Sequence, residues 1–197
     1  MRSVIRLPFT FEAGPLQREV EDIPDGVWSP HFQPDYFEGE WSGLALRSIG
    51  GTVERLFPYR HAGGVYLDTP MFDRCPAMRT VVDTFECGKE MVRLLRLAPN
   101  SRVLEHRDEK LNAERGVVRV HVPVLTNASV YFLLDGERVV LREGEAWVLD
   151  LSLPHRIDNR GTSDRIHLVI DCLSNAWLEE LFQFPGVGGT VGPFTHD

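Results

Sequence analysis

The sequence predicts a mainly β protein whose core is a double-stranded β-helix, the barrel also called a jelly roll. Short apolar-rich runs follow one another from Met91 to Cys172 without helical periodicity between them. Turn signals separate these runs, and Asp135-Gly136 is typical of a two-residue β-hairpin. Eight such strands joined by tight turns indicate a jelly-roll barrel.

The region before the barrel predicts a few shorter elements. Leu16 and Val20 fall on one side of a brief amphipathic helix, and Met78, Val81 and Phe85 have the spacing of a second one. We expect these helices to brace the outside of the barrel. The elements in order are a strand over 3–9, a helix over 13–21, an aromatic, turn-rich stretch over 24–43, a strand over 44–48, irregular chain over 55–70 and a helix over 76–85.

The barrel and the end of the chain complete the prediction. We expect strands over 91–97, 102–108, 117–125, 129–134, 137–142, 145–150, 155–159 and 165–172. Ser174 or Asn175 can cap a final helix that ends near Phe182. The chain is predicted to form one domain over 1–197, with bracing and lid elements in 1–90, the barrel in 91–173, the C-terminal helix in 174–184 and a flexible tail in 185–197.

The composition is typical of a globular protein with reduced thiols. The 197 residues are 43% hydrophobic and 25% charged, which suits one sizeable core. A net charge of −8 and the lack of a basic run argue against a nucleic-acid partner, although a local Arg cluster can still bind a small anion. Three cysteines without CxxC spacing favour a reducing compartment. Without an apolar run of membrane-spanning length or a signal peptide, we expect a cytoplasmic protein without a membrane partner.

His106 and Asp108 are the first candidate metal ligands. On a strand, residues two apart point to the same face, so this imidazole and carboxylate can coordinate the same metal ion. His155, at the start of a later strand, supplies a third ligand. Two imidazoles and one carboxylate form the facial arrangement that suits Fe(II) and leaves coordination positions open.

Further polar residues fall on the same face of the neighbouring predicted strands. Arg119 and His121 share one face of 117–125, and Arg165 and His167 share one face of 165–172, while the alternate positions are mostly apolar. A buried charge without a partner costs several kcal/mol. This collection of polar groups therefore needs a reason, and a metal with an anionic ligand provides one.

Each of these residues also has a purely structural interpretation. An isolated H-x-D is common by chance, and His155 would then be a histidine at a loop edge. Arg165 would pair with Asp150 or Asp171, and His121 and His167 would be satisfied core histidines, which for His167 is the preferred interpretation. The aromatic stretch over 24–43 would cap the core and form no substrate wall. The joint pattern, with an Arg ten residues after the later His, is more specific than any member.

Four segments carry a resemblance to a known family: RLLRLAPNSRVLEHRD (93–108), RVH (119–121), WVLDLSLPH (147–155) and DRIHLVID (164–171). Together they resemble the aspartyl/asparaginyl β-hydroxylase family, which comprises cupin-fold, Fe(II)- and 2-oxoglutarate-dependent oxygenases. The resemblance is strong over 91–173 and weaker before it. The Leu-Pro-His and His-Leu-Val segments are especially similar to the bacterial proline cis-4-hydroxylase branch of the family, which acts on free amino acids.

The resemblance implies roles for individual residues. His106, Asp108 and His155 would bind Fe(II), and Arg165 would pair with the distal carboxylate of 2-oxoglutarate, the co-substrate used with O2. The family's R-x-H motif falls on Arg119 and His121, which would contact the co-substrate or help to hold it. Vertebrate peptide-modifying members have Gly where Asp108 stands and a co-substrate-binding Ser where Leu95 falls. Both departures favour the bacterial, small-molecule branch.

The expected activity is hydroxylation of an amino-acid side chain, with release of succinate and carbon dioxide. A free amino acid is favoured over a peptide as substrate. Arg93 shares inward parity with Leu95 and is a candidate for holding a substrate carboxylate, while His31 and Trp41 are candidate lid residues. The alternatives are a peptidyl Asp/Asn β-hydroxylase, a metal-binding cupin that is not an oxygenase, and a metal-free scaffold. The sequence does not indicate an oligomeric state.

Overall fold

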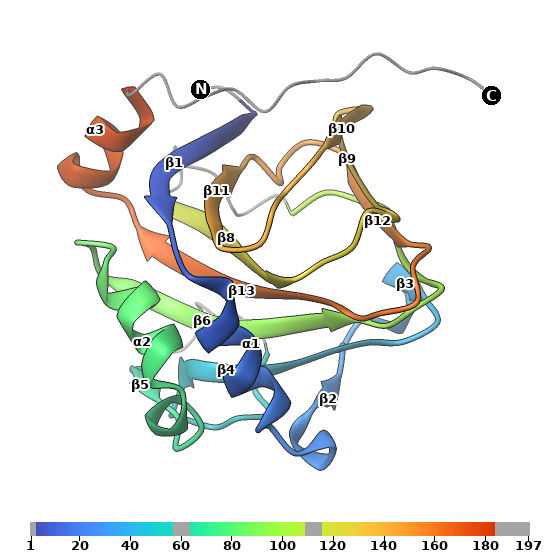
Figure 1. Ribbon diagram of the computed structural model, residues 1–197. Coiled ribbons are helices and arrows are strands. Elements are labelled where there is room, and N and C mark those ends of the chain that lie inside the picture. Colours follow the sequence, from blue (N-terminus) through green and yellow to red (C-terminus); the bar gives the residue numbers. More distant parts are fainter. Residues whose placement is uncertain (1–2, 57–63, 109–115, 184–197) are drawn as a thin grey trace.

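A computed structural model describes residues 3–56, 64–108 and 116–183, which form two antiparallel β-sheets and three α-helices (Figure 1). The expected tail over 185–197 and part of the irregular chain over 55–70 lie outside the described residues. In spatial order, the larger sheet contains β1 (Val4–Thr10), β11 (Glu145–Leu149), β8 (Val117–Leu125), β13 (Arg165–Leu173), β6 (Lys89–Leu97), β4 (Trp41–Ile49) and β2 (Ser29–Pro30), with β5 (Tyr66–Asp68) paired to β4. The smaller sheet contains β10 (Glu137–Val139), β9 (Val130–Leu134), β12 (His155–Asn159), β7 (Ser101–His106) and β3 (Phe37–Glu38).

The helices pack on the outside of the larger sheet. They are α1 (Ala13–Glu21), α2 (Pro76–Asp83) and α3 (Ala176–Gln183), with short 3-10 turns at Asp25–Val27, Pro34–Tyr36 and Phe72–Arg74. Figure 1 places α1 and α2 side by side against this sheet and α3 next to β1, in agreement with their contacts. The apolar side chains between helices and sheet form one hydrophobic core, which includes Leu16, Met78 and Leu178.

A second hydrophobic core fills the space between the two sheets. It draws Leu97, Trp147 and Val169 from the larger sheet and Val103 and Phe132 from the smaller one. Side chains therefore alternate along the shared strands: even-numbered residues of β8 and β13 face the helices, and odd-numbered residues face the barrel interior. This alternation carries Arg119, His121, Arg165 and His167 into the interior, as strand parity predicted.

The predicted hairpin at Asp135-Gly136 is confirmed. Asp135 has φ 52° and Gly136 has φ 80°, the pair of positive angles that a type I′ turn requires, and Leu134 pairs with Glu137 across it. The strand after the turn is shorter than the expected 137–142. It ends at Val139, and further along the N–H of Arg142 donates to the Glu145 side chain (3.3 Å).

The N-terminal region contributes strands to both sheets in addition to the expected helices. β1 pairs with β11, β4 with β6, and β3 with β7. The strand expected over 44–48 begins earlier, at Trp41, because Trp41 already pairs with Leu97 of β6. These pairings cover sheet edges that would otherwise be exposed.

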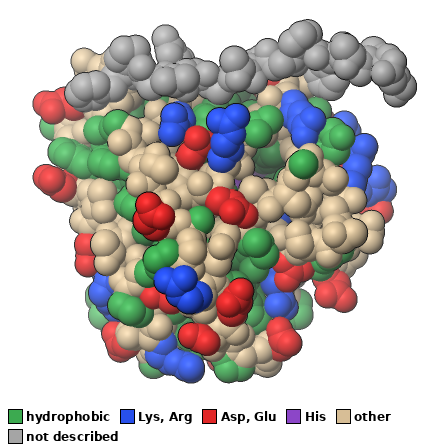
Figure 2. All heavy atoms as spheres, viewed as in Figure 1, with side chains coloured by type: hydrophobic (Ala, Val, Ile, Leu, Met, Phe, Trp, Pro, Cys, Tyr) green, Lys and Arg blue, Asp and Glu red, His purple; other side chains and the backbone are tan. Residues whose placement is uncertain are grey.

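Charge is spread over the surface. Figure 2 shows acidic side chains distributed over one face among polar and hydrophobic ones, in keeping with the net charge of −8. None of the described helices is long and apolar enough to cross a membrane. The cysteines, Cys75, Cys87 and Cys172, are free thiols.

Candidate metal centre and ligand pocket

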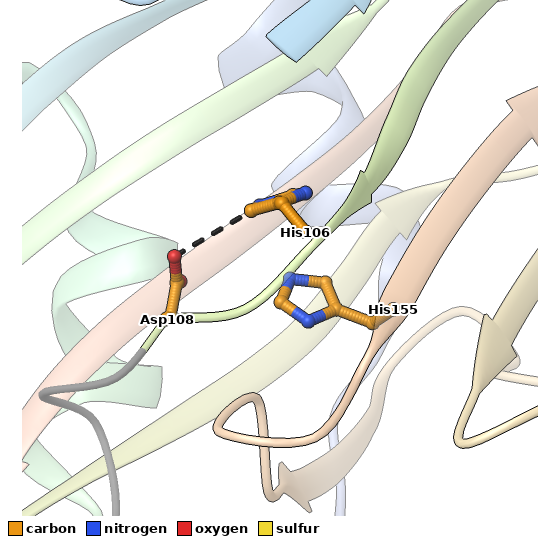
Figure 3. Close-up of side chains that lie close together, drawn as sticks. All are labelled: His106, Asp108 and His155. Carbon is orange, nitrogen blue, oxygen red and sulfur yellow. Dashed lines mark ion pairs between the residues drawn. The ribbon is translucent and has the colours of Figure 1, made fainter.

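Two paired strands of the smaller sheet bring the three predicted metal ligands together. His155, the first residue of β12, is the direct partner of His106, the last residue of β7. Their imidazole centroids are 4.2 Å apart, and His106 Nε2 lies 3.9 Å from Asp108 Oδ1 (Figure 3). One ligand atom from each of the three residues lies within 4.8 Å of the others.

Asp108 reaches this position from outside the strand, whereas the parity argument had placed it on the strand. β7 ends at His106, so the expected strand over 102–108 is too long by two residues. The N–H of Asp108 donates to the carbonyl of Leu151 (2.8 Å), which holds the backbone against the turn before His155. The carboxylate is consequently still directed toward the imidazoles (Figure 3).

Backbone contacts set both histidines up as ligands through Nε2. Nδ1 of His106 lies 2.8 Å from the carbonyl oxygen of Leu104, and Nδ1 of His155 lies 3.0 Å from that of Leu153. Because a carbonyl only accepts, each Nδ1 carries the proton and each Nε2 has a free lone pair. Burial lowers the pKa of His155, which favours the neutral, ligating form. Two imidazoles and a carboxylate fit a facial Fe(II) site.

Arg119 lies between two carboxylates. Its Nε and Nη2 donate to the two oxygens of Asp171 (2.7 and 3.1 Å), and its Nη1 donates to Asp108 Oδ2 (2.9 Å). Asp171 is 1% exposed and Arg119 is 7% exposed. Burial would raise the pKa of Asp171, but the charges of Arg119 and Arg93 lower it below its usual value, so the carboxylate stays ionised.

Arg93, the candidate for holding a substrate carboxylate, lies beside this pair. Its Nη1 is 3.4 Å from Asp171 Oδ2, and the residue is 5% exposed. Burial and the positive charge of Arg119 lower the pKa of the Arg93 guanidinium to about 10. Arg93 and Arg119 thus share Asp171, and the guanidinium of Arg93 has the weaker ion pair.

Arg165 is buried and pairs with no carboxylate in the described part of the chain, so the interpretation that it pairs with Asp150 or Asp171 is wrong. Asp171 is engaged by Arg119 and Arg93, and Asp150 accepts from Ser152. Arg165 is 3% exposed, and burial lowers its pKa to about 9. Its Nη2 lies 3.1 Å from Nδ1 of His167, and its Nε has no hydrogen-bond partner among the described residues.

A cavity of about 620 Å³ adjoins Arg165. Arg165 and His167 line its inner wall, and Phe132 lines it as well. The ring of Phe132 lies 6.4 Å from that of His155, so a residue that lines the cavity also lies next to the candidate metal site. The other lining residues are Thr126, Asn127, Ala128, Val130, Arg138, Val139, Val140, Leu141, Arg142 and Glu143.

Several polar atoms that point into the barrel lack partners. Within the described part of the chain, these include both ring nitrogens of His121, Nε1 of Trp41 and Nε of Arg165. Burial lowers the pKa values of His121 and His167 well below the usual range, so both rings are neutral. Buried polar atoms are nearly always satisfied, and an unsatisfied group calls for an explanation such as a ligand.

The two candidate lid residues stack on each other. The rings of His31 and Trp41 are 3.5 Å apart at 12°. Burial, followed by the charge of Arg93, lowers the pKa of His31 to about 3, and the charges of His106, Asp108 and Arg119 act on it as well. His31 therefore lies within electrostatic range of the candidate metal site. Tyr36 lies closer still, with its ring 5.0 Å from that of His106.

Sequence reasoning missed Asp171, Tyr36 and Phe132 as parts of the site. Asp171 had a readable signal, because it shares parity with Arg165 and His167, yet it was considered only as a structural partner for Arg165. Tyr36 lies in the predicted aromatic stretch with nothing to distinguish it from its neighbours. Phe132 is one apolar residue of a barrel strand, and no pattern marks it.

The comparisons with known proteins agree with this architecture. A family model described as Aspartyl/Asparaginyl beta-hydroxylase matches residues 17–175. The L-proline cis-4-hydroxylase of Rhizobium meliloti (strain 1021) is 27% identical over 175 residues, which are 88% of this chain and 61% of that protein. The chain thus spans less than two thirds of this relative's length.

Two solved structures share the fold at low sequence identity. The non-heme alpha ketoglutarate dependent carbocyclase SnoK from nogalamycin biosynthesis has a TM-score of 0.58 at 10% identity, over 88% of this chain and 80% of that one. A Pseudomonas putida prolyl-4-hydroxylase has a TM-score of 0.54 at 10% identity, over 88% of this chain and 94% of that one. These similarities confirm the predicted double-stranded β-helix.

Proposed function

Because the chain belongs to the aspartyl/asparaginyl beta-hydroxylase family, we propose that it is an Fe(II)- and 2-oxoglutarate-dependent hydroxylase of an amino-acid side chain. The products would be the hydroxylated amino acid, succinate and carbon dioxide. One observation carries the proposal: a three-residue metal site shares the barrel interior with a buried, unpaired guanidinium. A metal-binding cupin of another class needs the first feature and leaves the second unexplained.

His106, Asp108 and His155 are the proposed iron ligands. Bound there, Fe(II) would supply the activation of O2 that hydroxylation of an unactivated carbon requires. The protein's own contribution is to hold the ligand atoms ready: carbonyls fix the protonated Nδ1 of each imidazole, and Arg119 fixes Asp108. Such orienting contacts are a regular part of metal sites.

Arg165 is the proposed partner of the distal carboxylate of 2-oxoglutarate. A planar guanidinium binds a carboxylate through two parallel hydrogen bonds. Burial depresses the pKa of this group to about 9, so an anion beside it would restore favourable surroundings for the charge. His121 and Trp41 have ring nitrogens without a partner among the described residues, so they offer further polar contacts to a ligand rich in oxygen atoms.

We propose a free amino acid as the substrate, in preference to a residue within a peptide. The name of the proline hydroxylase relative supports a small amino acid. The stacked rings of His31 and Trp41, with Tyr36 beside His106, would form an apolar wall near the reacting carbon. Arg93 is the candidate group for the substrate carboxylate, because its pairing with Asp171 is long and shared with Arg119.

Succinate production tests this proposal. Purified protein with Fe(II), 2-oxoglutarate and O2 is screened against the twenty amino acids and short Asp- or Asn-containing peptides. We expect succinate that depends on a free amino acid and is absent in His155→Ala. Asp108→Asn should also abolish it, whereas Asp158→Asn, which only removes a surface pair with Arg160 in the same sheet, should not.

A binding experiment separates the proposal from its rivals. Under anaerobic conditions, Fe(II) and 2-oxoglutarate together should produce a weak visible charge-transfer absorption, and Arg165→Leu should weaken it. Metal binding without any effect of 2-oxoglutarate would support a cupin that is not an oxygenase. Succinate formed only with peptides would transfer the assignment to a peptidyl hydroxylase.

A further inference from the structure

The ion pair between Arg119 and Asp171 adjoins the proposed iron site without belonging to its ligands. The two residues are direct cross-strand partners on β8 and β13. Both carboxylate oxygens of Asp171 accept from Arg119, at 2.7 Å from Nε and 3.1 Å from Nη2. A guanidinium held by two parallel hydrogen bonds has a fixed plane. The direction of its remaining nitrogen, Nη1, is thereby fixed too.

That remaining nitrogen points at Asp108. Nη1 of Arg119 donates to Oδ2 of Asp108 at 2.9 Å, while the other oxygen, Oδ1, is the one nearest to Nε2 of His106. One carboxylate oxygen is therefore engaged by the protein and the other is left for a metal. The contact thus selects which oxygen of Asp108 serves as a ligand.

Asp108 needs such a contact more than the two histidines do. Both histidines lie on strands and are oriented through Nδ1 by backbone carbonyls. Asp108 lies beyond the end of β7, and its side chain is 29% exposed. Among the described residues, Arg119 is its only hydrogen-bond donor. Without that contact the carboxylate is free to rotate into solvent.

We propose that Asp171 is a positioning residue for the metal site, acting through Arg119 on Asp108. This inference rests on the proposed function, and it adds the orientation of the iron ligand to the co-substrate contact expected of Arg119. Three of the five N–H groups of Arg119 donate to carboxylates, and one of these three bonds goes to Asp108. Asp171 is needed because Arg119 is buried beside another cation, Arg93, and would otherwise lack a fixed counter-charge.

A double-mutant cycle on metal affinity tests the relay. Co(II) is titrated into wild-type protein, Asp171→Asn, Asp108→Ala and the double variant, and the cobalt absorption bands report both affinity and coordination. Removing an outer partner of a metal ligand typically weakens binding about 10–100-fold, and we expect this for Asp171→Asn. In the Asp108→Ala background, Asp171→Asn should change the affinity less than about twofold, because it acts only through Asp108.

Two results would overturn the relay. Asp171→Asn could bind Co(II) with wild-type affinity, or it could weaken Co(II) binding equally in the wild-type and Asp108→Ala backgrounds. Asp158→Asn is the matched control for removing a carboxylate and should bind Co(II) as wild type does. Should Asp171→Asn fail to fold, the cycle is run with Arg119→Lys, which keeps the charge and loses the planar fork, and the same outcomes decide. A wild-type protein that binds no Co(II) would overturn the proposed function as well, whereas normal binding without the relay would overturn this inference alone.

Discussion

The two ends of β13 both carry buried charges, but these charges are paired at one end and unpaired at the other. At one end, Asp171 pairs with Arg119 and Arg93, and Arg119 continues to Asp108. At the other end, six residues earlier and roughly 20 Å along the strand, Arg165 pairs with no carboxylate of the described residues. Both ends are almost completely buried. The first end is therefore complete as it stands, and the second is not.

This difference indicates what each end is for. A buried ion pair with good geometry orients its members without any ligand, which suits residues that must be in place before a metal arrives. An unpaired buried guanidinium is costly, and it is retained where a ligand supplies the missing charge. On the proposed function, the barrel therefore combines an end that is pre-organised for a metal with an end that an anion completes.

Asp171→Asn should cause the largest loss of stability. Removing one partner of a buried ion pair leaves the other uncompensated and typically costs about 3–5 kcal/mol. We expect the free energy of unfolding of the metal-free protein to fall by that amount, as measured by urea denaturation. Asp158→Asn, which removes a partner of the exposed Arg160, should change it by less than about 1 kcal/mol. Equal stability of the two variants would contradict the difference between the two ends.

Arg165→Met should have the opposite effect: it should not lower the stability of the ligand-free protein, but it should weaken the binding of 2-oxoglutarate. It replaces an unpaired cation by an apolar side chain of similar length, so the ligand-free protein should be at least as stable as wild type. Affinity for 2-oxoglutarate should fall about 100-fold, because a charge-assisted pair is worth about 3 kcal/mol. Thermal unfolding with and without 2-oxoglutarate measures both effects: ligand at 100 times the wild-type Kd stabilises wild type by about 2.7 kcal/mol and should stabilise the variant by only about 0.4 kcal/mol. A strongly destabilised variant would mean that Arg165 has a structural partner.

Sequence reasoning identified both ends of β13 but not how they differ. Strand parity placed Arg119, His121, Arg165 and His167 inside the barrel, because alternation is a local property of each strand. Pairing between Arg119 and Asp171 depends on the register of two strands about fifty residues apart, which no local pattern encodes.

The metal ligands were likewise predictable as a group, while their geometry was not. The H-x-D spacing and the later His identified the three residues, yet Asp108 lies beyond the strand on which parity had placed it. Its position depends on Arg119 and on the backbone of Leu151, both distant in sequence. The strand expected over 3–9 is present as β1, whereas β3 and β5 were missed for a related reason, since both are short and are defined by the partners they pair with.

His121→Phe applies the same comparison of partnered and unpartnered groups to two histidines, with a smaller expected change in stability. Neither ring nitrogen of His121 has a hydrogen-bond partner among the residues that the structure describes, so an aromatic ring without polar atoms should raise the stability of the ligand-free protein by about 1 kcal/mol. His167→Phe is the matched control, because Nδ1 of His167 contacts Arg165 and its loss should lower stability by a similar amount. Urea denaturation of the two variants should give changes of opposite sign. A loss of stability in both would show that His121 is satisfied within the fold.

His31→Phe should have the smallest effect, visible only in the pH dependence of stability. Burial and the charge of Arg93 lower the pKa of His31 to about 3, whereas an unfolded chain binds this proton near pH 6.5. Unfolding therefore takes up a proton between these values, so the contribution of His31 is fully present above pH 6.5 and is lost as the pH falls toward 3.

The Phe ring keeps the contact with Trp41 and cannot titrate. Urea unfolding of the metal-free variant should show that its stability falls less steeply than that of wild type between about pH 6.5 and 4. The slope of the logarithm of the unfolding constant against pH should differ by up to about one proton. Arg93, Asp108, His106 and Arg119, whose charges act on His31, are present in both proteins, so the two proteins differ only in the side chain at position 31. An unchanged slope would mean that His31 binds its proton equally well in the folded and the unfolded protein. The positive charges near the candidate metal site would then have no effect on the pKa of His31.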